Sequence, residues 1–192
     1  MAGRVAGRMP ESPGTFGATA SREVALTLIG ADRVGIVAAM ASVLADLGSN
    51  LEDSSMTILR GHFAMTLIIS TPASVDAVRA AVAPVAASLG LVVDVREVSL
   101  DPAGPDAGVR HTLVVQGADR PRIVARVMSV VAEHGGNVTD LTTRLVGTLY
   151  LLVAEVDLRA ASDVDALSDA LSLVALELGV VASLRPVEAD VL

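Results

Sequence analysis

The sequence contains one segment twice, and this duplication limits the possible fold more than any other feature. Residues 30–38 recur as residues 117–125, at an offset of 87 positions and with seven of nine residues identical. Three further residues recur at the same offset: Gly48, Asn50 and Asp53 return as Gly135, Asn137 and Asp140. The two segments match over a long stretch without gaps, and the repeat occurs only twice. Such a repeat indicates two fused domains rather than a solenoid.

Composition divides the chain around the two copies. Residues 1–22 are rich in Gly, Pro, Ser, Thr and Ala and lack periodicity, which predicts a flexible N-terminal tail. Residues 101–109 have the composition of a linker. We therefore expect one domain at 23–100, a second at 110–187, and a short C-terminal tail at 188–192.

The apolar pattern predicts the same order of elements in each copy: strand, helix, strand, strand, helix, strand. In copy one we expect strands at 23–29, 50–59, 62–70 and 91–98, and helices at 36–47 and 74–88. In copy two we expect strands at 111–116, 137–146, 148–156 and 180–185, and helices at 122–134 and 163–178. Ser74 is the expected cap of its helix, and a capping-box pattern begins at Ser162. The order βαββαβ predicts an α+β fold of two ferredoxin-like plaits, each an antiparallel four-stranded sheet with both helices on one face.

The absence of two residue types removes several kinds of chemistry. The chain has neither Cys nor Lys, so all 14 basic residues are Arg. This excludes disulfides, zinc–thiolate sites, cysteine nucleophiles, Schiff bases and the lysine of a P-loop. His62, His111 and His134 lack the paired spacing of metal ligands, and no G-x-S-x-G motif occurs. We therefore expect no enzyme activity, no catalytic residue, no metal and no cofactor.

The charge of the chain argues against two kinds of partner. A net charge of −8 repels phosphate backbones and anionic membranes, so we expect no direct binding to nucleic acid or membrane. An RNA-recognition plait would need stacking aromatics at the positions of His62 and Ala64, and they are missing. The longest stretches without charged residues, 61–75 and 80–93, are too short to span a bilayer. With no apolar segment typical of a secretory signal at the N-terminus, we expect a cytoplasmic protein.

The duplicated turn is the candidate binding site. It runs from a strand directly into a helix, whose free amides and dipole favour an anion, and the lack of Lys suits a carboxylate better than a pyrophosphate. Alternatively, Gly30, Asp32 and Gly35 serve only the tight turn. Asn50 and Asn137 open the second strand of each copy and cap or turn the chain there, whereas Asp53 and Asp140 could face an ammonium group.

These motifs resemble the signature of ACT domains, small plaits that bind amino acids and regulate other proteins. Two such units with nothing catalytic attached resemble the glycine cleavage system transcriptional repressor group. In that family two units lie side by side, and the effector lies between a strand–helix loop of one unit and the second strand of its neighbour. The resemblance implies ligand-binding positions in copy one at Asp32, Arg33, Val34, Gly35, Ile36, Asn50, Leu51 and Asp53. In copy two it implies Asp119, Arg120, Pro121, Arg122, Ile123, Asn137, Val138 and Asp140.

The resemblance implies an amino-acid-binding regulatory protein that acts through a protein partner, either a regulator or an enzyme. The alternative is an ACT module without a ligand that only docks onto such a partner. Two positions depart from the family pattern, because Val34 replaces its Pro and Arg122 replaces its Gly. Arg122 either blocks the second loop or adds a charge-assisted bond to a larger acidic ligand. We favour blocking, and therefore expect the carboxylate of an effector to favour copy one.

Self-association is expected through copy two. Its third strand carries Leu149, Leu151 and Val153 on the face where copy one has His62, Ala64 and Thr66. Helices should cover the opposite face of this strand, which carries Tyr150 and Leu152. The first face is therefore an apolar patch that needs a cover, either a second chain or the neighbouring copy, and we expect a homodimer.

Overall fold

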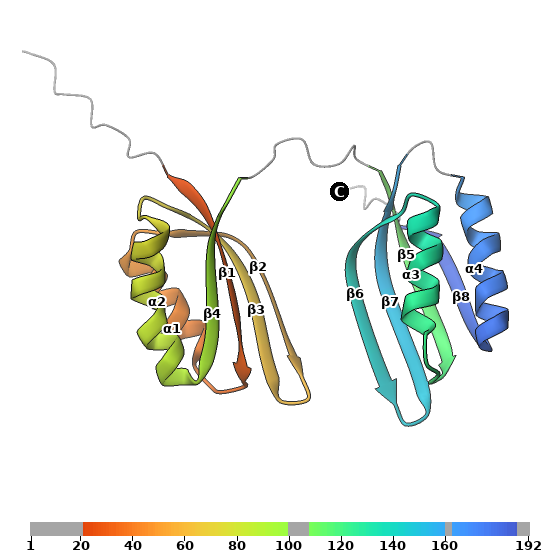
Figure 1. Cartoon of the computed structure of the whole chain (residues 1–192), viewed down its shortest axis with the longest axis horizontal. Helices are drawn as coiled ribbons and strands as arrows, with labels where there is room; N and C mark the ends of the chain where they lie inside the picture. Colours follow the sequence, from red (N-terminus) through yellow and green to blue (C-terminus); the bar gives the residue numbers. More distant parts are fainter. Residues whose placement is uncertain (1–20, 100–107, 160–162, 188–192) are drawn as a thin grey trace, which may run out of the picture. The chain divides into compact units, whose positions relative to one another are not determined.

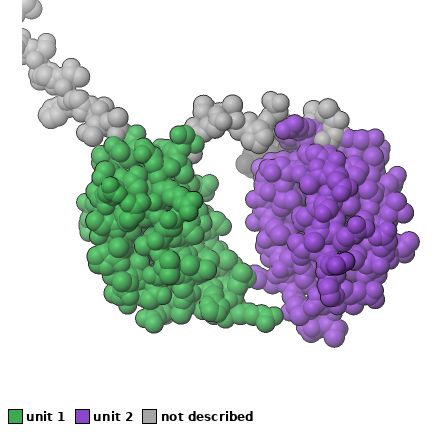
Figure 2. Space-filling view, in the orientation of Figure 1, with its two compact units in different colours: residues 1–100 green, residues 101–192 purple. Residues whose placement is uncertain are grey.

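The computed structural model describes residues 21–99, 108–159 and 163–187. The chain divides into two compact units, one within residues 1–100 and one within residues 101–192 (Figure 2). The predicted tails and linker lie almost entirely outside the described residues. The exceptions include Arg22 and Val109, which begin the first strand of each unit.

Unit 1 has the predicted βαββαβ order. Its elements are β1 (Arg22–Ala31), α1 (Ile36–Asp46), β2 (Asn50–Leu59), β3 (His62–Thr71), α2 (Val75–Leu89) and β4 (Leu91–Val98). The strands form one antiparallel sheet in the order β2-β3-β1-β4. Both helices cover the same face of this sheet (Figure 1).

Unit 2 repeats this arrangement. Its elements are β5 (Val109–Ala118), α3 (Ile123–Glu133), β6 (Asn137–Val146), β7 (Leu149–Leu158), α4 (Val164–Leu178) and β8 (Val180–Pro186). The sheet order is β6-β7-β5-β8, and both helices again lie on one face (Figure 1). The predicted fold of two ferredoxin-like plaits is therefore confirmed.

Several helix ends differ from the prediction by one residue. Residues Arg122 and His134, expected inside α3, are instead its N-cap and C-cap. The predicted capping box of α4 is not what caps it, because Asp163 is the N-cap and its carboxylate accepts a hydrogen bond from the amide of Ala166. Ser162 lies outside the described residues. Ser74 caps α2 as expected, and its hydroxyl accepts from the amide of Ala77.

Each core lies between one face of a sheet and its two helices. In unit 1 the alternation predicted for β3 is confirmed, since its odd-numbered apolar residues are buried: Phe63, Met65, Leu67 and Ile69. In β7 of unit 2 the buried set is Leu152, Ala154, Val156 and Leu158. The opposite face of each sheet carries no helix of its own unit (Figure 1).

The strands β2 and β6 lie at the edge of their sheets and are exposed over almost their whole length. Each contains a β-bulge at the same place, between Leu51 and Asp53 in β2 and between Val138 and Asp140 in β6. A bulge inserts an extra residue and changes which side chains share a face. This irregularity sets the direction of the polar residues at the start of each strand.

Candidate functional site

The loop between β1 and α1 is held at the hairpin end of unit 1. The amide of Asp32 donates a hydrogen bond of 2.9 Å to the carbonyl of Gly61, in the turn between β2 and β3. Val34 is fully exposed at the tip of the loop, whereas Ile36 belongs to the core with 2% of its surface exposed. Ile123 is equally buried in unit 2. Of the five predicted loop positions, the isoleucine therefore anchors the helix start and faces away from any ligand.

The arginine of each loop lies over the glycine that ends the second helix of its unit. A β-carbon at Gly90 would lie 3.6 Å from Nη2 of Arg33, and one at Gly179 would lie 3.1 Å from Nη1 of Arg120. Both glycines are helix C-caps with positive φ. A cation at a helix C-terminus is favourable because the last carbonyls carry partial negative charge. The two guanidinium groups therefore lie beside the end of the neighbouring helix, a placement that the sequence motif alone did not reveal.

The residue before each first helix adopts a left-handed backbone. Gly35 has a φ of 91°, and Arg122 at the equivalent place has a φ of 73°. Nothing lies within 4 Å of the position that a β-carbon of Gly35 would take. The glycine is thus explained by its conformation rather than by crowding from the protein. Neither α1 nor α3 has a side-chain cap, so the first amides of both helices are open to an anion.

The start of β2 presents two polar side chains on the sheet face opposite the helices. Asn50 pairs with Ser70, and Asp53 pairs with Ile68; directly paired residues share a face. Between them the Nδ2 of Asn50 donates to Oε1 of Glu52, the bulge residue, at 2.8 Å. Leu51 pairs with the buried Ile69 and therefore points to the helix side. In a regular strand two residues three positions apart point to opposite faces of the sheet. The bulge adds one residue and thereby brings Asn50 and Asp53 to the same face.

A partly buried pair of hydroxyl groups fixes the backbone just before this strand. The Ser49 hydroxyl donates to Oγ1 of Thr71 at 2.8 Å, and the amide of Ala73 donates to the same oxygen at 3.2 Å. Thr71 is fully buried. The turn after α1 and the turn after β3 are thereby joined.

In unit 2 the start of β6 lies in a more charged environment. Asn137 pairs with Asp157, and Asp140 pairs with Glu155. Arg110 lies 3.6 Å from the carboxylate of Glu155 and 3.5 Å from that of Asp157. Unit 1 has Ile68 and Ser70 in place of the two acids of β7, so the two strand starts differ in charge.

No single unit brings the loop and the strand start together. The loop contacts the hairpin at the beginning of β3, whereas Asn50 pairs near the end of β3. Strand β3 has 10 residues, and each residue of a strand adds about 3.3 Å to its length. The loop residues and the residues at the start of β2 therefore lie roughly 30 Å apart. A ligand of amino-acid size therefore reaches only one of the two sets in any one unit.

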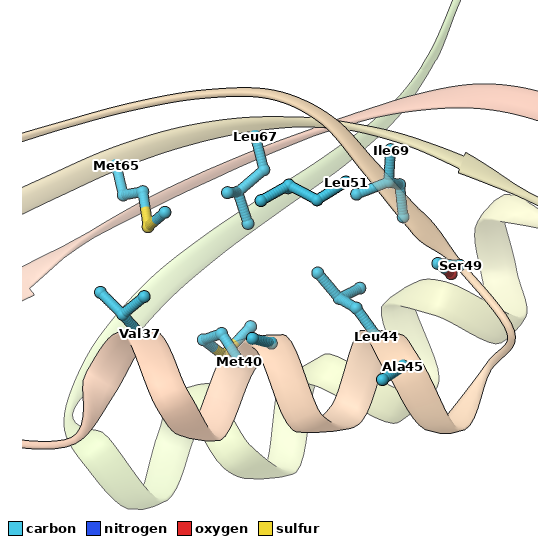
Figure 3. Close-up of a pocket in the computed structure, with 10 residues that line it drawn as sticks. Val37, Met40, Leu44, Ala45, Ser49, Leu51, Met65, Leu67 and Ile69 are labelled. Carbon is cyan, nitrogen blue, oxygen red and sulfur yellow. The ribbon is translucent and has the colours of Figure 1, made fainter.

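The sequence analysis missed an apolar cavity of about 210 Å³ in unit 1, between α1 and strands β2 and β3 (Figure 3). Its floor is made of buried core residues, namely Met40, Leu44, Met65, Leu67 and Ile69. Its rim consists of Val37, Ala41 and Ala45 on α1 together with Ser49 and Leu51. The one available signal was a difference between the copies, because unit 2 has Met128 where unit 1 has Ala41.

Two of the three histidines have structural partners. The Nδ1 of His111 lies 2.9 Å from the carbonyl of Val109, and that of His134 lies 2.9 Å from the carbonyl of Val130. Among the described residues, no group of three or more His, Asp or Glu side chains could hold a metal ion. Within this part of the chain, no helix is both long enough and apolar enough to span a membrane.

The fold and the duplicated loops define the class of protein: two ferredoxin-like plaits in tandem, each with an open helix N-terminus after its first strand. Direct comparison identifies the family. The ACT domain family matches residues 23–96 and again residues 111–184. The chain therefore belongs to the ACT domain family, as its motifs predicted.

Solved structures with the same two-unit organisation are known. A protein of unknown function from Galdieria sulphuraria is 28% identical, with a TM-score of 0.74 over 87% of this chain and 99% of that one. A protein provisionally assigned as a glycine cleavage system transcriptional repressor is 15% identical, with a TM-score of 0.67 over 88% of this chain and 99% of that one. At this identity, the second likeness shows the fold alone.

Curated relatives match a shorter part of the chain. A UPF0237 protein of Methanopyrus kandleri is 54% identical over 44 residues, which are 23% of this chain and 49% of that protein. A UPF0237 protein of Corynebacterium diphtheriae is 47% identical over 45 residues, which are 23% of this chain and 51% of that protein. The chain thus spans about half the length of these relatives.

Proposed function

We propose that this protein is an amino-acid-responsive regulator that acts through a protein partner. The observation that carries the proposal is the pair of open helix N-termini at α1 and α3, each preceded by a left-handed residue. Such a terminus favours a carboxylate, and membership of the ACT domain family supports an amino acid as its source.

The binding mode that we propose uses two separate sets of groups. The carboxylate of the effector accepts hydrogen bonds from the first amides of α1, next to Gly35. The ammonium group is received by Asn50 and Asp53 at the start of the β2 strand of another copy of the chain. The distance between the two sets within one unit supports this division, because a single amino acid is far too short to join them.

We infer that the loop of unit 1 is the stronger of the two sites. Gly35 leaves the space beside the α1 amides empty. Arg122 carries a long side chain at the N-cap of α3, where we expect it to compete with a ligand for the volume beside the first amides. One effector per chain is the expected stoichiometry.

Calorimetric titration of the full chain with a panel of amino acids tests this proposal. We expect at least one amino acid to bind with one site per chain, and Gly35→Arg to abolish binding while circular dichroism shows a folded protein. Arg122→Gly is the matched control, since it makes the reverse change in unit 2 and leaves the first site intact. Unchanged affinity in Gly35→Arg would place the site elsewhere, and a complete absence of binding would refute the sensor.

A docking module without a ligand is the second candidate, and the edge strands favour it. On the helix side of β2, Met56 and Ile58 are 48% and 45% exposed, and on β6 Leu141 and Leu145 are 41% and 47% exposed. Unpaired strand edges with exposed apolar side chains are typical of surfaces that another chain covers. In this case no amino acid changes the melting temperature, although a partner protein still binds.

We also propose that copy two mediates a homodimer. Strand pairing places Leu149, Leu151 and Val153 on the sheet face without helices, next to Val146, which is 69% exposed. Leu149→Arg is expected to lower the mass measured by light scattering at high micromolar concentration from that of a dimer to that of a monomer. A wild-type protein that is monomeric at this concentration would contradict the proposal.

A further inference from the structure

The cavity in unit 1 accepts only an apolar group. Its floor consists of five buried apolar side chains, and Figure 3 shows the residues of α1 pointing toward those of β2 and β3 across it. Its one hydroxyl, that of Ser49, already donates to Thr71. A charged or strongly polar group would lose its hydration there without gaining a partner.

The size of the cavity fits a small hydrocarbon group. Its volume is about 210 Å³, and an apolar cavity of about 150 Å³ in another protein is known to bind benzene. Two of its floor residues, Met40 and Met65, have flexible side chains that adapt to ligands of different shape. The cavity opens at a rim where Val37 is 43% exposed and Leu51 is 50% exposed, so a ligand has access from solvent.

The comparison of the two copies indicates that this space belongs to unit 1 in particular. On α3, Met128 stands at the position of Ala41 and packs against the core of unit 2. The same position therefore carries a long side chain in one copy and a single methyl group in the other. A methionine at position 41 would extend over the floor of the cavity from its rim.

The position of the cavity connects it with the proposed amino-acid site. Its rim includes Leu51, which lies in β2 between Asn50 and the bulge. Asn50 and Asp53 lie on the opposite face of the same edge strand, so only the width of one strand separates them from the cavity. A small molecule with a polar head and an aliphatic side chain could contact both across the edge of the sheet.

We propose that this cavity binds the side chain of an aliphatic amino acid, of the size of leucine, isoleucine or methionine. This inference rests on the proposed function and adds the class of effector to it. Each methylene group that enters an apolar pocket strengthens binding by about tenfold. Leucine has four more side-chain carbons than glycine and three more than serine, so it is expected to bind at least 100-fold more tightly than either.

The test is calorimetric titration of the full chain with leucine, isoleucine, methionine, glycine and serine, in the wild type and in three variants. Ala41→Met fills the cavity and is expected to weaken leucine binding at least tenfold. Ser42→Met places the same side chain at an exposed position of α1 that does not line the cavity, and Met128→Ala makes the reverse change in unit 2. Both controls are expected to keep the affinity of the wild type for leucine.

The outcomes separate this inference from the proposed function. If glycine or serine binds and the aliphatic amino acids do not, the sensor stands and the inference is wrong. If no amino acid binds, both are wrong. Leucine binding that survives Ala41→Met in a folded protein would exclude the cavity as the side-chain site. A fall in the mass of the protein in Ala41→Met, without any change in leucine binding, would show that a second copy covers the cavity and would likewise overturn the inference.

Discussion

Exchanging the residues at positions 35 and 122 should shift the stability of the two units in opposite directions. The two positions are equivalent, and both adopt a left-handed backbone, with φ of 91° at Gly35 and 73° at Arg122. A residue with a β-carbon is strained in this region, by about 1–2 kcal/mol. Arg122 is exposed, so the strain of its backbone should dominate the effect of replacing it.

The expected magnitude follows from two opposing contributions. Arg122→Gly removes about 1–2 kcal/mol of strain but adds flexibility to the unfolded chain, which costs about 0.4–1 kcal/mol. Unit 2 should therefore gain about 0.5–1 kcal/mol, or roughly 2–8 °C in melting temperature for a domain of this size. Gly35→Arg should destabilise unit 1 by about 1 kcal/mol, since its φ lies even further from the values that side chains tolerate.

The two units can be followed separately because their aromatic residues differ. The chain has no Trp and a single Tyr, Tyr150, which packs against the core of unit 2. Tyrosine fluorescence during urea denaturation therefore reports on unit 2, whereas circular dichroism reports on both units. Arg122→Gly should move the fluorescence transition to higher urea, and Gly35→Arg should leave it in place. Gly35→Ala is the control that carries the backbone strain without the long side chain.

A loss of stability in Arg122→Gly would refute this reasoning. It would mean that the Arg122 side chain makes a stabilising contact that outweighs the strain of its backbone. A shift of the tyrosine transition in Gly35→Arg would also contradict it, because the two units would then not unfold independently.

Three further predictions concern packing and partners. Thr71→Val should lower the free energy of unfolding of unit 1 by about 1–3 kcal/mol in urea titrations, because Ser49 and the amide of Ala73 lose their acceptor; Thr71→Ser should retain most of the stability. Gly136→Ala should destabilise unit 2 by about 1–3 kcal/mol, measured by tyrosine fluorescence, because its β-carbon would lie 2.7 Å from Cγ1 of Val131. The purified protein should not bind duplex DNA in low-salt mobility-shift assays, because its net charge is −8; specific, salt-sensitive binding at nanomolar concentration would contradict this.

The fold could be predicted from the sequence because local signals agree with the global pattern. Alternating apolar residues identify β3 and show which of its faces is buried, and the glycines at helix ends mark where helices stop. Element boundaries were less accurate. Arg22 and Val109 extend their strands because they pair with Thr71 and Leu158 on the neighbouring strands, and such pairing is invisible in a single segment.

The candidate site was predictable only in part, because its key features depend on distant contacts. The motif identified Arg33, but Gly90, over which it lies, comes at the far end of unit 1 in the sequence. The bulge that turns Asn50 and Asp53 to one face has no clear signature in residue type. The cavity depends on how Ala41 packs across the sheet, which periodicity alone does not define.

The two copies share several features of the backbone, whereas some of their side chains differ. Both copies keep the left-handed residue before the first helix, the arginine over a helix-ending glycine and the bulge in the edge strand. These features define the geometry of the loop and of the strand start. At two of the positions where the copies differ, Ala41 against Met128 and Gly35 against Arg122, unit 1 has the smaller residue. Duplication thus provides two equivalent scaffolds, and these two side-chain differences favour unit 1 for the site that we propose.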